Sequence, residues 1–89
     1  MTRTDILSQA VATYGAPAQI DMAVEEAAEL IHALCKFKRH ASEDKIRDVL
    51  EEVADMRIML DQMALVFGSC SHIEEQKIER LKRRLENAK

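Results

Sequence analysis

Apolar residues recur along this chain every three or four positions, which is the period of an amphipathic α-helix. Four such stretches can be separated, and they predict helices over residues 5–14, 17–39, 43–67 and 72–88. No internal repeat or low-complexity segment interrupts them. The pattern therefore indicates a short first helix, two long central helices and a last helix that is rich in charge.

Residues that favour helix ends lie at the borders of these stretches. Gly15 and Gly68 follow the first and third stretches, where a left-handed backbone ends a helix. Ser42 precedes the third stretch and is a candidate N-cap. Ser71 and Glu74 have the spacing of a capping box, so we expect Ser71 to cap the last helix.

The composition supports an all-α fold, a bundle of about four helices in one domain over residues 1–89. Only 3% of the residues are aromatic, with two Gly and one Pro, whereas strands and their turns need more of these types. A chain of this length buries only about 60% of the surface that its unfolded form exposes. Residues 43–67 also carry a second apolar ridge, made of Leu50, Ile58 and Leu65. We therefore expect a homodimer, or a dimer of dimers, to complete the core.

Charge and cysteine content exclude several classes of partner. The 13 Lys and Arg residues are outnumbered by 16 Asp and Glu residues, and the net charge of −3 argues against nucleic-acid binding. No run of eighteen apolar residues and no apolar leader is present, so we expect no membrane association. Cys35 and Cys70 lack the spacing of a zinc or redox motif and are expected to be reduced thiols. These features predict a cytoplasmic protein.

Some carboxylates fall on apolar helix faces, where charged side chains are uncommon. On a helical wheel of residues 17–39, Glu26 lies at the edge of the apolar stripe, and Glu29 lies about 60° further round. In residues 43–67, Glu52 lies within the apolar arc and Asp55 at its border. No Lys or Arg stands three or four residues from Glu52. A cation from another helix or a bound metal ion is needed to offset this charge.

The two acid pairs share an i, i+3 spacing, so their four carboxylates can converge if the long helices pack antiparallel. Oxygen ligands without His or Cys are what a hard divalent ion such as Mg²⁺ prefers, and Mn²⁺ accepts the same ligands. The pattern therefore predicts a site for such a metal ion between the two long helices.

The order of these acids resembles the E-E-x-x-E … E-x-x-D signature of the MazG-like, all-α nucleoside triphosphate pyrophosphohydrolases. The first half reads Glu25-Glu26-Ala27-Ala28-Glu29, and the second reads Glu52-Val53-Ala54-Asp55 after a gap of 22 residues. The resemblance extends from Gln19 through the last helix. Many members of that family carry Gly where this chain has Ala54, and we expect this exchange to do little harm because Ala is small and favours helices.

The resemblance implies an enzyme that hydrolyses a nucleoside triphosphate between its α and β phosphates, giving a monophosphate and pyrophosphate. Deoxy or non-standard nucleotides are the substrates that the family favours. By the same resemblance, Glu26, Glu29, Glu52 and Asp55 correspond to the Mg²⁺ ligands. A carboxylate would orient the attacking water as general base, and Glu25 and Glu29 are both candidates between which the sequence does not decide.

Basic residues of the last helix are candidates for binding the triphosphate. Lys77, Arg80 and Arg84 share one edge of that helix, from which they could reach phosphate oxygens. The alternative is a solvated basic face that pairs with Glu74 and Glu79.

Phe37 is the candidate contact for the nucleobase, because it shares the helix edge of Glu26. A place in the core is the alternative for this side chain. The base itself cannot be identified from the sequence.

Two other classes of protein fit parts of the pattern. Glu29 and His32 form a Glu-x-x-His pair of the kind found in di-iron carboxylate bundles, with Glu52 as a bridging ligand. His32, however, lies on the polar side of its helix, and turning it inward would expose Leu34. A non-enzymatic or inactive helical module is the second alternative, although it would not need a carboxylate on a core face.

Overall fold

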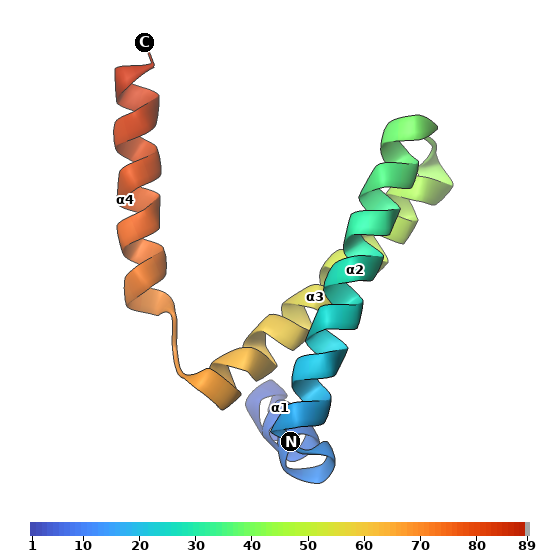
Figure 1. Cartoon of the computed structure of the whole chain (residues 1–89), viewed down its shortest axis with the longest axis vertical. Helices are drawn as coiled ribbons and strands as arrows, with labels where there is room; N and C mark the ends of the chain where they lie inside the picture. Colours follow the sequence, from blue (N-terminus) through green and yellow to red (C-terminus); the bar gives the residue numbers. More distant parts are fainter. Residues whose placement is uncertain (89) are drawn as a thin grey trace.

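The computed structural model describes residues 1–88 and is built of α-helices joined by short links. The helices are α1 (Arg3–Tyr14), α2 (Ala16–Arg39), α3 (Glu43–Phe67) and α4 (Ser71–Asn87) (Figure 1). The described part of the chain contains no strand, so the predicted all-α class with four helices is confirmed. None of the helices over these residues has the length and apolar character that crossing a membrane requires.

Three of the predicted helix borders are confirmed by the backbone. Gly15 and Gly68 follow α1 and α3 with φ values of 89° and 111°, a region that side chains other than glycine rarely adopt. Ser42 caps α3, because its hydroxyl accepts a hydrogen bond of 3.2 Å from the backbone N–H of Lys45.

The start of α1 carries a cap that the sequence pattern did not identify. The side chain of Thr2 accepts a hydrogen bond from the backbone of Asp5, and the Asp5 carboxylate accepts one from the backbone of Thr2. Asp5 thus takes the place that Glu or Gln has in the usual capping box.

The predicted cap of the last helix is wrong. Ser71 is already the first residue of α4, and Cys70 before it makes no capping hydrogen bond through its side chain. The backbone N–H of Ser71 instead donates to the hydroxyl of Ser69, 3.2 Å away, and the two serine hydroxyls lie 2.9 Å apart. Because the Ser71 hydroxyl is engaged by Ser69, it does not reach the N–H groups of the first turn of α4.

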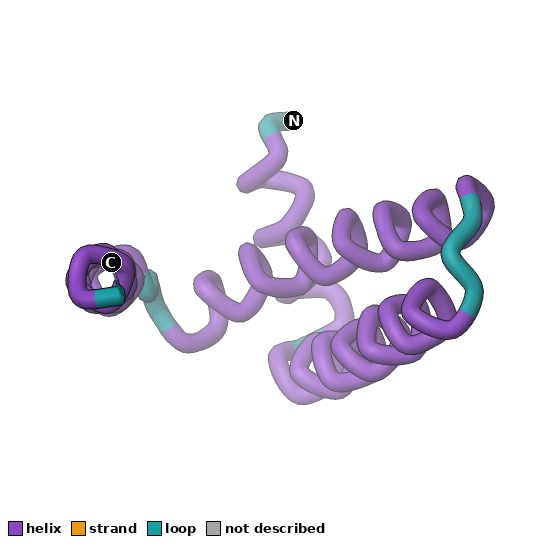
Figure 2. The backbone as a smooth tube through the Cα atoms, turned by 90° about the horizontal axis from the view of Figure 1, so that it is seen from above, coloured by secondary structure: helices purple, strands orange, loops and turns teal. Residues whose placement is uncertain are grey.

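The helices α2 and α3 form an antiparallel hairpin, in which α3 passes behind α2 in Figure 1 and lies beside it in Figure 2. The less exposed residues that face the partner helix recur at alternating spacings of four and three, which is the repeat of a coiled-coil seam. In α2 the repeat is Gln19, Ala23, Glu26, Leu30, Ala33 and Phe37, and in α3 it is Lys45, Val49, Glu52, Met56, Met59 and Met63. Two of the predicted site carboxylates therefore lie in the seam itself.

Helix α1 packs against both long helices near the end of the hairpin that lies away from the α2–α3 link. Leu7 is its buried residue, with 7% of its surface exposed. Arg3 forms an exposed ion pair with Asp61 of α3 at 2.8 Å. The α1–α3 contact therefore combines one buried apolar side chain with a surface ion pair.

Helix α4 stands apart from the other three helices (Figure 1). It packs against none of them within residues 1–88, and Figure 2 shows it end-on beside the rest of the chain. Its apolar residues are Ile73, Ile78, Leu81 and Leu85, and each is at least half exposed. The position of α4 leaves one side of this helix without the apolar contacts that its sequence could make.

Candidate metal centre between α2 and α3

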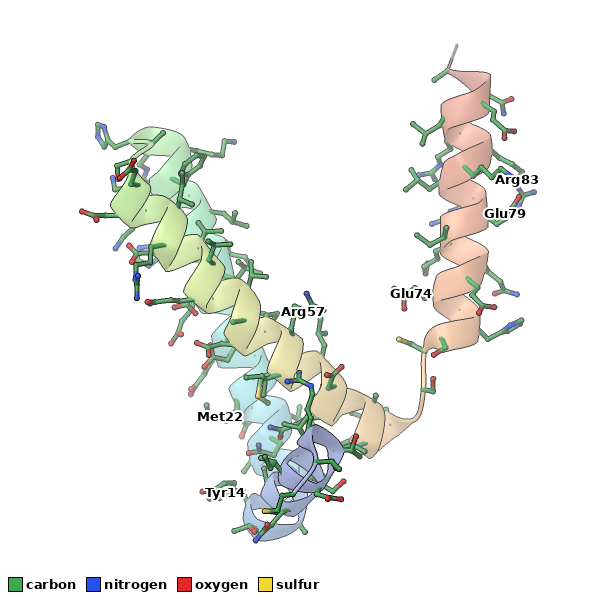
Figure 3. The ribbon with its side chains drawn as sticks, turned by 180° about the vertical axis from the view of Figure 1, so that it is seen from behind. Tyr14, Met22, Arg57, Glu74, Glu79 and Arg83 are labelled. Atoms are coloured by element: carbon green, nitrogen blue, oxygen red, sulfur yellow. The ribbon has the colours of Figure 1, made fainter. Side chains whose placement is uncertain are left out.

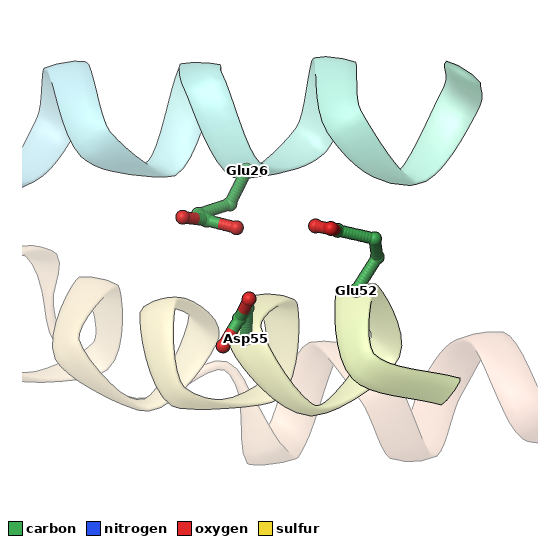
Figure 4. Close-up of side chains that lie close together, drawn as sticks. All are labelled: Glu26, Glu52 and Asp55. Atoms are coloured by element: carbon green, nitrogen blue, oxygen red, sulfur yellow. The ribbon is translucent and has the colours of Figure 1, made fainter. Parts of the chain in front are cut away.

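Three carboxylates converge across the seam of the hairpin. Glu26 comes from α2, and Glu52 and Asp55 come from α3 (Figure 4). One oxygen atom from each lies within 4.8 Å of the others, which is the spacing of ligands around a single ion. The convergence follows from the antiparallel packing, because Glu26 stands opposite the turn of α3 that carries the other two acids.

Two oxygens of this cluster are shielded and unpaired. Oε2 of Glu26 and Oε2 of Glu52 are both buried, and neither has a hydrogen-bond partner. Both side chains are half-buried overall, whereas Asp55 is exposed. Because a buried carboxylate oxygen without a partner is costly, a cation at this point would relieve an existing defect of the seam. The residues present therefore fit a divalent ion bound by oxygen ligands.

The protonation of the cluster reflects the same crowding. Burial raises the pKa of Glu26 above the ordinary value of 4.5, and the negative charges of Glu29, Asp55 and Glu52 raise it further. Burial likewise raises the pKa of Glu52, followed by the charges of Glu29, Asp55 and Glu51. The folded chain thus holds protons on these two acids more tightly than the unfolded chain does.

Glu29 and Glu25 have different positions relative to the cluster. Glu29 is exposed and lies outside the group of three, but its charge acts on both Glu26 and Glu52. Glu25 is exposed and is not one of the converging acids. Of the two candidates for the general base, Glu29 is therefore the one that borders the cluster.

A hollow of about 170 Å³ adjoins the cluster on the side of the α2–α3 link. We call it the charged hollow. Its lining includes Glu29, His32 and Lys36 of α2 and Lys45, Asp48 and Glu52 of α3. The lining is mixed in charge, because the two lysines lie among four carboxylates, of which Glu51 is the fourth.

Sequence reasoning missed these two lysines, although a spacing signal was present. Lys36 follows Glu29 by seven residues, and Lys45 precedes Glu52 by seven. Seven residues are two helical turns, so each lysine lies on the same face as its acid, about 10 Å along the helix.

The basic residues predicted on the last helix lie elsewhere within one copy of the chain. Lys77, Arg80 and Arg84 are exposed on α4, which does not approach the hairpin. Their binding of a triphosphate stays a prediction that needs a second copy or a movement of α4. Phe37 is half-buried at the seam, eleven residues from Glu26, and its contact with a base likewise stays a prediction.

Comparisons with protein-family models, with curated proteins and with solved structures find no match to this chain. The carboxylate cluster and the surfaces beside it are therefore the features from which a function can be inferred.

Proposed function

We propose that this protein is a Mg²⁺-dependent nucleoside triphosphate pyrophosphohydrolase, which cleaves between the α and β phosphates. The observation that supports it best is the convergence of Glu26, Glu52 and Asp55, with two shielded oxygens that lack any partner. A seam of helices gains nothing in stability from such a cluster. Retaining it is understandable if the acids hold a cation.

In this proposal Glu26, Glu52 and Asp55 hold the metal ion, and Mn²⁺ could replace Mg²⁺. The bound ion would neutralise phosphate oxygens and lower the pKa of a water molecule. Glu29 borders the cluster and orients the attacking water as general base. The resemblance to the MazG-like family selects the same four acids and counts Glu29 among the metal ligands, whereas in this proposal three acids hold the ion and Glu29 acts as the base.

The charged hollow has the residues to hold the outer phosphates. Lys36 and Lys45 line it beside Glu52. Their ammonium groups would attract the pyrophosphate portion and stabilise the charge that develops on it as the anhydride bond breaks. This proposal gives the phosphate-binding role within one copy to these lysines.

The test is a panel of ribo- and deoxynucleoside triphosphates with Mg²⁺, scored separately for monophosphate, pyrophosphate and inorganic phosphate. We expect monophosphate and pyrophosphate in equal amounts, and no turnover with EDTA. Release of inorganic phosphate would contradict the assigned bond. Absence of turnover with every nucleotide would favour a non-enzymatic helical module.

A matched pair of variants ties the reaction to the cluster. Glu52→Gln should lower pyrophosphate release by at least about 100-fold, because even residues that only support a metal ligand contribute 10- to 100-fold. Glu79→Gln, on the exposed surface of α4, should leave the rate unchanged. Equal rates for both variants would remove Glu52 from the reaction.

The di-iron alternative receives less support from the geometry. The converging group within residues 1–88 is made of carboxylates alone, and His32 lines the adjacent charged hollow without joining that group. Iron loading followed by absorption spectroscopy separates the two proposals, since an oxidised di-iron centre absorbs visible light and a magnesium site does not.

A further inference from the structure

A second and larger pocket lies on the opposite side of the carboxylates from the charged hollow. It has a volume of about 600 Å³ and is mainly apolar, with walls from α1, α2 and α3. Its lining includes Tyr14, Met22 and Met59, together with Gln19, Gln62 and Asp21. We call it the glutamine pocket. Figure 3 shows Tyr14 and Met22 on the same side of the molecule, away from α4.

The two glutamines are the most deeply buried polar residues of the described chain. Gln19 is 6% exposed and Gln62 is 4% exposed. The side-chain amide NH2 group of Gln19 donates a hydrogen bond to the side-chain carbonyl oxygen of Gln62. This bond uses one polar group of each side chain, so an acceptor on Gln19 and a donor on Gln62 remain, on residues that line the pocket. Exchanging oxygen and nitrogen in both side chains would leave the same kinds of group.

A donor and an acceptor match the edges of nucleobases, which present hydrogen-bonding groups side by side. In protein–DNA complexes a single glutamine supplies both groups to adenine, whereas here Gln19 and Gln62 would supply one each. The pocket walls suit the faces of a base, because an aromatic ring stacks on it and methionine thioethers adapt to its shape. The charged residue in the lining is Asp21, whose carboxylate would repel a phosphate.

The glutamine pocket, the carboxylates and the charged hollow follow one another along the hairpin. Rows of residues spaced by seven run through the glutamine pocket, the carboxylates and the charged hollow. In α2 one row is Gln19, Glu26 and Ala33, and the other is Met22, Glu29 and Lys36. In α3 one row is Met59, Glu52 and Lys45, and the other is Gln62, Asp55 and Asp48. The three sites therefore share one face of the hairpin, each about 10 Å from the next.

This order matches the order of groups in a nucleoside triphosphate. A base in the glutamine pocket would place the sugar and the α-phosphate toward Glu26 and Asp55. The β and γ phosphates would then extend toward Lys36 and Lys45. The reverse direction would bring the polyphosphate against Met22 and would leave its charge unpaired.

We infer that the glutamine pocket binds the nucleobase of the substrate and that the Gln19–Gln62 pair selects among bases by hydrogen bonding. This inference rests on the proposed function, since it takes the carboxylate cluster as the point where the α-phosphate binds. It places the base at the opposite end of α2 from Phe37, so Gln19 and Gln62 replace Phe37 as the predicted base contacts.

The test uses the full chain in EDTA, so that base binding is observed without metal or catalysis. Adenosine, guanosine, cytidine, uridine and their deoxy forms are added separately, and the side-chain amide signals of the glutamines are followed by NMR. We expect at least one nucleoside to shift the signals of Gln19 and Gln62 and to leave Gln76 on α4 unchanged. Inorganic pyrophosphate should not shift the two pocket signals.

Variants then measure the contribution of the pair. The double variant Gln19→Leu/Gln62→Leu removes both glutamines together, so no buried amide is left without its partner. It should weaken nucleoside binding about tenfold. The matched control Gln76→Leu should bind as the parent does. If no nucleoside shifts the Gln19 and Gln62 signals of the parent, the inference is wrong, and the pocket is better explained as a contact with a second copy of the chain.

The outcomes separate this inference from the proposed function. Nucleoside binding at the glutamines without any pyrophosphate release would support the base site and contradict the enzymatic proposal. Pyrophosphate release at the same kcat/KM for every base, in the parent and in the double variant, would support the enzyme and contradict base selection by the pair. A change in base preference in the double variant, with turnover retained, would support both.

Discussion

At the level of single residues, Glu52 brings a carboxylate into a helical seam that consists mainly of apolar and small side chains. Burial and the neighbouring acids raise its pKa, and one of its oxygens lacks a partner. The charge therefore opposes folding as long as no cation balances it. A substitution that removes the charge of Glu52 also removes a metal ligand. The stability of the metal-free protein and its activity should therefore respond in opposite directions.

Glu52→Gln should leave the metal-free protein at least as stable as the parent, with an equal or higher Tm. Mg²⁺ should raise the Tm of the parent and have little effect on the variant, because a ligand stabilises only the state that binds it. Differential scanning fluorimetry with and without Mg²⁺ measures both effects, and Glu79→Gln is the control. If Glu52→Gln unfolds the metal-free protein, Glu52 is a structural acid and the metal-site argument fails.

The pH dependence of stability should also show that the negative charges of Glu26 and Glu52 oppose folding. Glu26 and Glu52 have raised pKa values in the folded chain, so above the ordinary value of 4.5 the unfolded chain binds fewer protons than the folded chain. The free energy of unfolding that these groups contribute therefore falls as pH rises from the ordinary value through the raised values. Their contribution is fully favourable only below that window.

This expectation is measured by urea unfolding of the parent and of Glu26→Gln/Glu52→Gln in EDTA. The double variant should gain stability relative to the parent as the pH rises above 4.5, because only the parent loses protons from these sites. Saturating Mg²⁺ should reduce the parent's loss. A stability difference that does not change with pH would show that the two acids titrate normally.

At the level of the helices, α3 and α4 differ in how they begin, because a serine side chain caps α3 and no side chain caps α4. Ser42→Ala removes the hydroxyl that accepts from the backbone of Lys45, and it should cost about 1 kcal/mol of unfolding free energy. Ser71→Ala should cost less than about 0.5 kcal/mol, since Ser71 is not the cap of α4 and that helix packs against no other. Urea denaturation monitored by circular dichroism compares them, and equal costs would contradict the assigned caps.

At the level of the whole molecule, one copy of the chain is more extended than its length requires. Its radius of gyration is 16.3 Å, whereas a compact chain of this length has about 12 Å. The difference arises because α4 projects from the hairpin and leaves its apolar residues exposed. Leu50, Ile58 and Leu65 on α3 are exposed as well, at 61%, 36% and 44%. Association with a second copy would cover such surfaces.

We therefore predict a dimer at micromolar concentration in sedimentation experiments. Leu81→Glu places a charge on the apolar side of α4 and should shift the protein toward the monomer, because a buried charge opposes association. Lys82→Glu changes the charge of the neighbouring exposed position and should have a much smaller effect. A monomeric parent would contradict the prediction and would leave α4 as a solvated helix.

The sequence by itself determined the local features of this protein. The period of the apolar residues, with Gly15, Ser42 and Gly68, was sufficient for four helices and most of their ends, because these signals act within a few residues. The conflict at Glu52 was also visible, since the absence of a basic neighbour on its own helix is a local property. The cap of α4 was misassigned, because Ser69 and Ser71 pair in a way that their spacing does not reveal.

The tertiary structure alone decided which residues of different helices meet. Antiparallel packing set the register of α2 against α3, and that register brought Glu26 to Glu52 and Asp55 but left Glu29 at the border. The same register joined Gln19 to Gln62, a pair separated by 43 positions in the chain. No local signal contains such a register, because it depends on how the side chains of two helices interlock along the whole seam.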